Sequence, residues 1–337
     1  MTIKDLSART GYSVGTVSRV LNDQPNVSEK ARKAILEAAR ESGFQLNTNA
    51  QQLKKQHTNS ILVVVKGISN QLFASLVEAM QARIARTRHP LIVDYMDEEG
   101  NEVLHALRLC REKKPLGVLF LGGNRENFQA DFEKIGRPCV LVTNDASGLN
   151  FPNLSSVCSD NRQAARAAID ALVNLGHRQI AVIGGESQIS DTTRLRFQGC
   201  MDAFREHGIS FDPEQDYEAV RFSYADGYWA ARDLLDRGRS FSAIFAMSDV
   251  MAIGAIRALQ DRGKRVPEDV SVMGFDGLII GEYTVPRLAT VCQDVDALAI
   301  HSINMLLDNI AHPGLPRHET VPVTVSLRSS TGPAGNI

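Results

Sequence analysis

Apolar residues three and four positions apart, with polar residues between them, predict three short helices in residues 1–45. Residues that favour helix ends flank these runs: Thr2, Ser13 and Ser28 before them, Gly11 and Gly43 after the first and third. The link between the first two runs is only TGY, the short turn that a helix-turn-helix requires. Residues 1–45 are therefore predicted to form either a helix-turn-helix domain or an ordinary three-helix bundle that binds protein.

The second of these helices, within TGYSVGTVSRVLN (residues 10–22), has two unequal sides. Val17, Val20 and Leu21 make an apolar side, whereas the remaining positions are small or polar: Gly15, Thr16, Ser18, Arg19 and Asn22. A side with so little bulk can lie flat against a narrow, hydrogen-bonding partner. The third helix has a broader apolar face, made of Ala31, Ile35, Leu36, Ala38 and Ala39.

From residue 60 onward, short apolar runs alternate with amphipathic helical segments. The runs of a first series are ILVVV, PLIVDYM, GVLFLGG and CVLVTN, and those of a second are QIAVIGG, AIFAMS and VSVMGFD. Apolar strands separated by helices predict parallel sheets that are covered by helices on both faces. Because the two series meet near residue 160, we expect an α/β core of two Rossmann-like lobes.

The segment between the two parts, NTNAQQLKKQHTN, is polar and has no apolar period. Its single leucine, Leu53, is followed by two lysines. A segment of this composition is a linker that forms a helix only weakly by itself.

The net charge of −2 is unevenly distributed. Residues 1–60 contain nine Lys or Arg against five Asp or Glu, and the other residues contain 28 against 34. A basic first part on an acidic remainder is typical of a protein whose first part meets a polyanion, although a solvated helical face gives the same excess.

Composition and motifs indicate where in the cell the protein lies and which kinds of catalytic or metal site it lacks. The five cysteines are scattered and never form a CxxC pair, which predicts reduced, mostly buried thiols. The chain has no signal-peptide pattern and no apolar run that is long enough to cross a bilayer, so we expect a soluble cytoplasmic protein. It also lacks a helix-opening GxGxxG, HExxH, GxSxG, a Walker loop and metal-spaced His and Cys residues. We therefore expect no enzyme, cofactor or metal site.

The residues resemble one family throughout. IKDLSARTGYSVGTVSRVLNDQPNVSEKARKAILEAARESGF is similar to the DNA-binding headpiece of the LacI/GalR transcriptional regulators. The likeness continues through NAQQL, ISNQLF, VCSDN, LGHRQIAVIGG, RLRFQG, SDVMAIGAIRALQDRGKRVPEDVSVMGFD and SLRSST. It implies a ligand-responsive, sequence-specific DNA-binding regulator, a repressor of carbohydrate-related genes, whose core is similar to periplasmic sugar-binding proteins.

The resemblance also implies a division of the chain into three parts. These are a helix-turn-helix headpiece (1–46), a hinge helix and linker (47–59) and an effector-binding core (60–337). Within the core, it implies an N-lobe of about 60–159 and 292–319 and a C-lobe of about 160–291 and 320–332.

In this family the second helix is the recognition helix, which enters the major groove of DNA. Val14 and Gly15 stand at its base-reading start, and Arg19, which can bond bidentately to guanine, stands one turn later. Other residues would contact the phosphate backbone and so position the helix on the DNA: Ser13, Thr16, Ser18 and Asn22. Helix packing is the alternative role for Thr16.

The resemblance also gives the lone leucine of the linker a role. In family members, hinge helices of two subunits pair in the minor groove, and a leucine from each wedges into the central base step. Leu53 stands at that position, with Ala50 small enough for close approach and Lys54 able to reach phosphate. Packing of Leu53 on the core is the alternative.

The likeness places an effector in the core. Arg196 stands at the family's effector-binding arginine, Asp276 at a strand end that faces the cleft, and Phe222 where members place an aromatic residue. Weaker candidates are Phe73, Thr143, Ser248 and Asp249, the last of which could instead cap the following helix.

Three departures from the family pattern concern the effector. Gly277 follows GFD where many relatives have Asp or Asn, Gln71 replaces a common Pro, and Thr143 replaces a frequent Asp. They predict a cleft with fewer carboxylates than a typical sugar site. We expect a sugar or sugar derivative, with a nucleoside or an acidic metabolite as the second choice.

No leucine heptads follow SLRSST, so the expected assembly is a homodimer, which suits a two-fold symmetric operator. The competing interpretation is a sugar-binding protein or an enzyme on the same two-lobed scaffold. The YSVGTVSRVLN helix argues against a transport-type binding protein, which would lack it.

Overall fold

The structure is a computed structural model that describes residues 3–21, 27–42, 59–68, 70–188 and 190–335. The chain divides into two compact units, residues 1–57 and 58–337. The expected hinge lies outside the described residues except for its last position, Asn59.

The first unit contains the three predicted helices, α1 (Ile3–Thr10), α2 (Val14–Leu21) and α3 (Glu29–Glu41). One small core joins them, built from Leu6, Val17, Val20, Ala31, Ile35 and Ala39. Gly11 makes the turn between α1 and α2 at a φ of +73°, a conformation that glycine adopts without steric cost. The Ser28 side chain caps α3 by accepting a hydrogen bond from the Ala31 amide.

One expectation for α3 was wrong, and two of the expected helix-end residues lie outside the described part. Leu36 is 46% exposed, because it lies one position past Ile35 and turns away from the core. Ser42 is the C-terminal cap of α3, so the helix ends before Gly43, which lies outside the described residues, as does Thr2.

The second unit is built on two six-stranded sheets, which confirms the two Rossmann-like lobes. The N-lobe sheet has the order β11-β5-β4-β3-β1-β2 and the C-lobe sheet the order β12-β10-β9-β8-β6-β7. All described pairings are parallel except that of β10 with β12. The N-lobe strands are β1 (Ile61–Lys66), β2 (Leu91–Met96), β3 (Gly117–Leu121), β4 (Cys139–Val142), β5 (Leu154–Cys158) and β11 (His318–Thr320). The C-lobe strands are β6 (Ile180–Gly184), β7 (Tyr217–Ala219), β8 (Ala243–Ala246), β9 (Ser271–Asp276), β10 (Ala289–Gln293) and β12 (Val323–Ser326).

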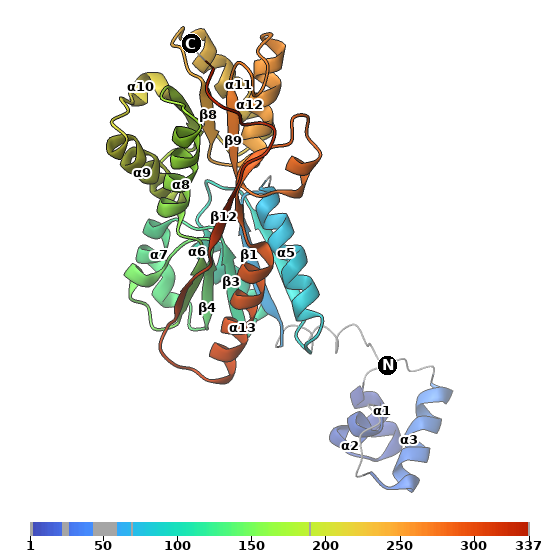
Figure 1. Cartoon of the computed structure of the whole chain (residues 1–337). Helices are drawn as coiled ribbons and strands as arrows, with labels where there is room; N and C mark the ends of the chain where they lie inside the picture. Colours follow the sequence, from blue (N-terminus) through green and yellow to red (C-terminus); the bar gives the residue numbers. More distant parts are fainter. Residues whose placement is uncertain (1–2, 22–26, 43–58, 69, 189, 336–337) are drawn as a thin grey trace. The chain divides into compact units, whose positions relative to one another are not determined.

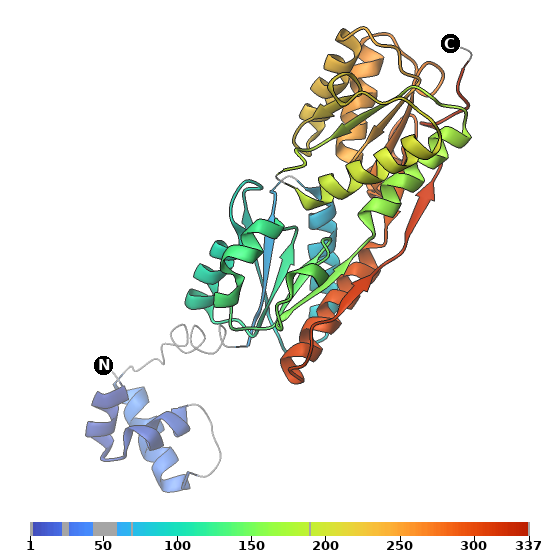
Figure 2. The same ribbon diagram turned by 90° about the vertical axis from the view of Figure 1, so that its left-hand side faces the viewer.

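Helices cover both faces of each sheet (Figures 1 and 2). In the N-lobe, α5 (Gln71–Ile84) and α13 (Val295–Ala311) pack on one face, and α6 (Glu102–Lys113) and α7 (Arg125–Asp131) on the other. In the C-lobe, one face carries α8 (Asn161–Asn174) and α9 (Asp191–Glu206), and the other carries α11 (Tyr224–Asp236) and α12 (Asp249–Asp261). A short helix, α10 (Pro213–Asp216), precedes β7. Helices on both faces bury the strands, which explains why the strands are almost purely apolar.

The chain passes between the lobes after β5, after β10 and between β11 and β12. The second passage comes slightly later than the expected position 292, because Gln293 still belongs to β10 and faces Val323 of β12 in the ladder. All five cysteines are unpaired, with Cys110 and Cys292 partly exposed and the other three buried.

Candidate DNA-reading helix and interlobe cavity

The exposed side of α2 is the side that the sequence assigns to DNA. Val17 and Val20 are buried against α1 and α3, whereas Ser13, Val14, Gly15 and Arg19 are exposed and Thr16 and Ser18 are half-buried. At about 100° per residue, positions 15, 18 and 19 lie on the side away from the buried valines, and position 14 lies about a quarter turn from them. A polar surface of low bulk therefore faces outward along the helix.

Ser13 shapes the start of this helix. Its hydroxyl oxygen accepts a hydrogen bond from the Thr16 amide at 3.2 Å and lies 2.9 Å from the Thr16 hydroxyl. This cap occupies the Thr16 side chain, in keeping with a partly structural role. Asn22, Ala50, Leu53 and Lys54 lie outside the described residues.

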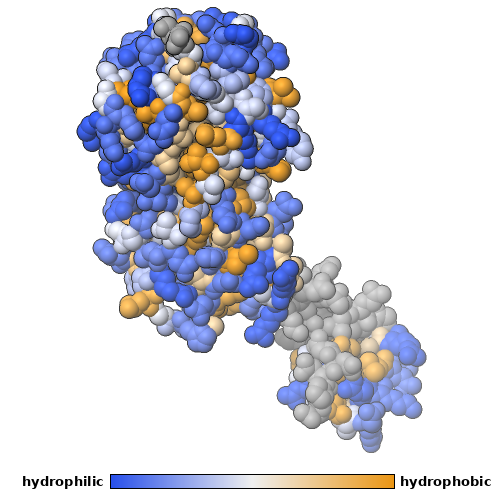
Figure 3. Space-filling model, viewed as in Figure 1, coloured by the Kyte–Doolittle hydropathy of each residue, from blue (hydrophilic) through white to orange (hydrophobic). Residues whose placement is uncertain are grey.

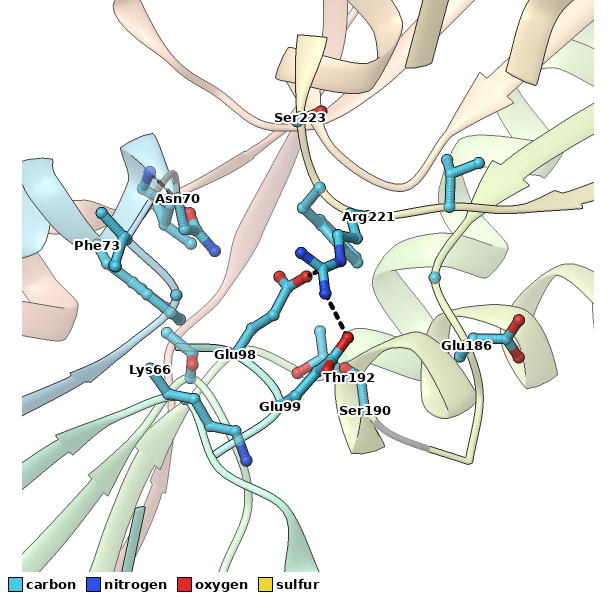
Figure 4. A pocket seen from close by; sticks show the side chains of 18 of the residues that line it. Lys66, Asn70, Phe73, Glu98, Glu99, Glu186, Ser190, Thr192, Arg221 and Ser223 are labelled. Atoms are coloured by element: carbon cyan, nitrogen blue, oxygen red, sulfur yellow. Dashed lines mark hydrogen bonds and ion pairs between the residues drawn. The ribbon is translucent and has the colours of Figure 1, made fainter. Parts of the chain in front are cut away.

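A cavity of about 620 Å³ separates the N-lobe from the C-lobe. Its wall consists largely of residues just beyond the carboxyl ends of β1, β2, β3, β4, β6, β7 and β9, which is where open α/β sheets bind ligands. Figure 4 shows residues of both lobes that line it. Five of the predicted effector residues line the cavity: Phe73, Thr143, Arg196, Phe222 and Asp276.

Arg196 and Asp276 lie on the C-lobe side of the cavity. The Arg196 side chain projects from α9 over the ring of Phe275, 3.6 Å from its centroid, and its Nη2 lies 3.7 Å from Asp276 Oδ1. Its Nε donates to Asn161 Oδ1 at 2.9 Å. These contacts hold a guanidinium and a carboxylate side by side, an arrangement that can donate to and accept from ligand hydroxyls.

Burial governs the protonation of this pair. Only 3% of Arg196 and 5% of Asp276 are exposed. Burial raises the pKa of Asp276 to about 6, against the opposing effects of Arg196 and a hydrogen bond from Gln293. Burial also lowers the pKa of Arg196 to about 10, which leaves this side chain charged at neutral pH.

Two aromatic side chains that line the cavity, Phe73 and Phe222, each pack directly against a glycine. A Cβ on Gly122 would lie 3.0 Å from Phe73, and one on Gly185 would lie 2.8 Å from Phe222. Glycine at these strand ends therefore leaves the room that each ring occupies. The two rings belong to different lobes and offer apolar surface beside the polar pair.

Ser248 and Asp249 do not line the cavity, contrary to the sequence expectation. Ser248 is buried and caps α12 by accepting from the Met251 amide at 3.4 Å. Asp249 is fully buried and accepts from the Thr290 hydroxyl and the Leu278 amide, both at 2.6 Å. Asp249 therefore serves the interior of the C-lobe, and the helix cap that the sequence allowed for it belongs to Ser248.

Arg221 joins the two lobes at the cavity. It follows β7 in the C-lobe and pairs with two N-lobe carboxylates, Glu98, at 3.1 Å from the guanidinium, and Glu99. Figure 4 shows the guanidinium between them. The sequence reasoning missed these residues, although the DEEG run directly follows a predicted strand and so stands at a ligand-binding edge.

The expectation of a carboxylate-poor cleft is also wrong. Six carboxylates line the cavity: Asp97, Glu98, Glu99, Glu186, Asp226 and Asp276. Most of them come from loops after strands, where the family motifs used for the prediction do not extend. The departures at Thr143 and Gly277 therefore do not deplete the site of carboxylates.

Comparison with known proteins places the whole chain in one family. The family described as "Bacterial regulatory proteins, lacI family" matches residues 2–47, and the "Periplasmic binding protein-like domain" matches residues 169–331. The HTH-type transcriptional regulator MalR of Clostridium butyricum is 33% identical over 323 residues, which cover 94% of this chain and 95% of MalR. The chain belongs to the lacI family.

Two solved structures show a similar fold over nearly the whole chain. The lac repressor dimer bound to operator and the anti-inducer ONPF is 25% identical, with a TM-score of 0.77 and coverage of 98% of this chain and 99% of that one. The complex of the transcriptional regulator CelR with cellobiose is 27% identical, with a TM-score of 0.72 and the same coverage.

In this lacI-family chain, the glycine after GFD has a local reason. Gly277 has a φ of +79°, and a Cβ there would lie 2.8 Å from Cα of Cys292. A side chain at this position would therefore require the β10 backbone to shift.

Neither a membrane span nor a metal-binding cluster is found among the described residues. No described helix has both the length and the apolar character needed to span a membrane. Within the same residues, no group of three or more His, Cys, Asp and Glu is placed to hold a metal ion.

Proposed function

We propose that the protein is a ligand-responsive, sequence-specific transcriptional regulator that represses carbohydrate-related genes. The observation that carries this proposal is the presence, in one lacI-family chain, of a helix with an exposed polar side and an interlobe cavity with a buried Arg–Asp pair. Because such a regulator acts where the chromosome is, its place is the cytoplasm. A sugar or sugar derivative fits the cavity through paired hydroxyls, and CelR forms its complex with the sugar cellobiose.

On DNA, we assign base reading to Val14 and Arg19 and backbone positioning to Ser13, Thr16 and Ser18. Arg19 is exposed at the outer side of α2, and a bidentate contact to guanine is worth roughly 1–3 kcal/mol of discrimination. The roles of Asn22, Ala50, Leu53 and Lys54 stay proposals from the family resemblance.

We further propose that the protein acts as a homodimer on a palindromic operator, as the lac repressor structure is a dimer on its operator. An exposed apolar segment after β9 supports self-association. Ile279 is 71% exposed, Tyr283 77% and Val285 87%. Figure 3 shows hydrophobic residues that interrupt the hydrophilic surface of the core in that view. Apolar side chains in this number on one short segment are typical of surfaces that another chain covers.

The cavity and α2 belong to separate units, so the effector controls DNA binding through a change in the core. Such coupling is reciprocal and is typically worth about 1–3 kcal/mol, or roughly 5- to 150-fold in affinity. Arg196 and Asp276 are the residues through which we expect the ligand to act, with Phe73, Thr143 and Phe222 around them.

The test combines footprinting with titration. The full-length protein is footprinted on the DNA upstream of its own gene, and the protected site is compared with a scrambled duplex at several salt concentrations and with candidate sugars added. We expect a two-fold symmetric footprint, a steep salt dependence and a sugar that changes affinity. Equal affinity for site and scrambled DNA would refute the function, and a D276A variant that still responds to the same sugar concentration would remove Asp276 from the effector site.

A further inference from the structure

The cavity wall carries unequal numbers of cations and carboxylates. Three cations line it, Lys66, Arg196 and Arg221, against the six carboxylates named above. What matters for a ligand is how many of these charges are already compensated by a neighbour in the protein.

All three cations are occupied. The Lys66 ammonium lies 2.6 Å from Glu102, a fully buried carboxylate that also accepts from the Asn124 amide and the Asn127 side chain. Arg196 is held by Asn161 and the Met247 carbonyl, with Asp276 beside it. Arg221 is shared between Glu98 and Glu99. Among the described residues that line the cavity, an anionic group would meet no guanidinium or ammonium that lacks a carboxylate partner.

Two cavity carboxylates from opposite lobes have no such partner. Asp97 accepts a hydrogen bond from the Glu99 amide at 2.9 Å, and Asp226 accepts one from the Ser223 hydroxyl, but neither forms an ion pair with any described residue. Both lie close enough to Glu98 to act on it. Burial is the largest cause that raises the pKa of Glu98, Arg221 opposes it, and Asp97, Glu99 and Asp226 add to it. The Glu186 carboxylate points away from Arg221 and takes no part in this arrangement (Figure 4).

We propose that the cavity selects an amino sugar, a polyhydroxylated ligand with a protonated amine, and rejects phosphorylated and carboxylated sugars. The Arg196–Asp276 pair is matched to hydroxyl groups, since it offers donors and acceptors side by side. The rim made by Asp97, Glu98, Glu99 and Asp226 favours a cation, because its one guanidinium, Arg221, pairs with Glu98 and Glu99 and leaves the charges of the other two carboxylates without an ion pair. This proposal rests on the proposed function only in taking the cavity as the effector site.

Isothermal titration calorimetry on the full-length protein without DNA tests the charge preference. The probes are matched sets in the gluco, galacto and manno series: the free sugar, its 2-amino derivative and its 6-phosphate. The D97N/D226N variant removes two charges and keeps both hydrogen bonds, because an asparagine oxygen accepts from the Glu99 amide and the Ser223 hydroxyl as well. The control is D236N/D308N, which removes one exposed carboxylate from each lobe outside the cavity.

In at least one series we expect the amino sugar to bind about tenfold more tightly than the neutral sugar, and the 6-phosphate not to bind. D97N/D226N should lose most of that preference, whereas the control should keep it. The proposal is overturned if the dissociation constant of a 6-phosphate lies within about threefold of that of the matching amino sugar, or if the neutral sugar binds as tightly as the amino sugar. It is also overturned if no amino sugar binds at about 10 mM, or if both variants lose the preference for the amino sugar equally. Operator binding by the same samples is measured separately, so failure of the charge preference and failure of the proposed function give different results.

Discussion

Replacing Asp249 with asparagine should make the protein progressively more stable than its natural form as the pH rises. Burial, followed by the charge of Asp276, raises the pKa of Asp249 to about 8, whereas an unfolded aspartate titrates near a pKa of about 3.9. The folded state thus keeps a proton that the unfolded state releases. The stability from this group is therefore complete below about pH 4 and falls as the pH rises towards 8.

The magnitude follows from that gap in pKa. Between about pH 5 and pH 7 each pH unit costs the native protein about 1.4 kcal/mol through this one group, or about 3 kcal/mol in all. The asparagine of the D249N variant does not titrate, yet its oxygen can accept from the Leu278 amide and its NH2 can donate to the Thr290 hydroxyl, as a protonated aspartate would. The stability advantage of D249N over the natural protein should therefore grow by about 3 kcal/mol between about pH 5 and about pH 7.

Urea unfolding at fixed protein concentration measures this difference. Trp229 is the only tryptophan and lies on α11, which packs against the helix that Asp249 begins, so its fluorescence reports the C-lobe. D236N serves as the control, because Asp236 is exposed and pairs with Arg262 on the surface of the same lobe. If D249N and the natural protein lose stability in parallel between about pH 5 and pH 7, Asp249 is not a buried, protonated acid and the reasoning fails.

Three further predictions concern the two lobes and the headpiece. R221Q, or about 0.5 M KCl, should speed amide hydrogen exchange in peptides covering 97–100 and 219–223, because the ion pairs of Arg221 to Glu98 and Glu99 join the lobes there. The control R239Q should not, because the partners of Arg239, Asp212 and Asp216, lie in its own lobe. Equal exchange in both variants would contradict the interlobe role. G254A should destabilise the C-lobe by about 1–3 kcal/mol in urea unfolding, since the new Cβ would overlap the Tyr224 carbonyl oxygen. The control G136A should leave the stability unchanged, because its new Cβ meets no atom within 4 Å. Equal unfolding midpoints for the two variants would show that α11 and α12 can move apart. In competition binding, R19A should lower the preference for operator over a duplex with one altered symmetric base pair by about 1–3 kcal/mol and change the non-specific affinity little. An equal loss of affinity for all DNA sequences would make Arg19 a phosphate contact.

The headpiece shows how local sequence can predict local structure. The spacing of Val17 and Val20, the cap at Ser13 and the glycine at position 11 each act within one helical turn or one link, and the structure has α2 where they place it. The apolar runs of the core are equally local signals, and β1, β3, β4, β6, β8 and β9 confirm them. Leu36 is the exception, because its burial depends on how α3 is rotated against the other helices.

The cavity was less predictable, and the reason is geometric. Arg196 and Asp276 could be placed from family motifs, but Arg221, Glu98 and Glu99 stand in loops without a motif, and their pairing joins segments more than 100 residues apart. Lys66 and Glu102 pair across two elements in the same way. No local sequence pattern predicts such a pair, because the order of the strands, which brings the loops together, is a property of the whole lobe.

Local sequence was enough to establish the class of this protein: a three-helix headpiece, a polar linker and two α/β lobes, since hydrophobic periodicity and helix-end residues act over a few positions. Which charges face the cavity, and which of them are compensated, depended on contacts between distant segments. Asp249 and Asp276 show the difference. Asp249 is the first residue of α12, shortly after β8, and Asp276 is the last residue of β9, yet the first is turned into the lobe interior and the second into the cavity. That choice depends on the Thr290 hydroxyl and the Leu278 amide, which only folding brings within hydrogen-bonding distance of Asp249.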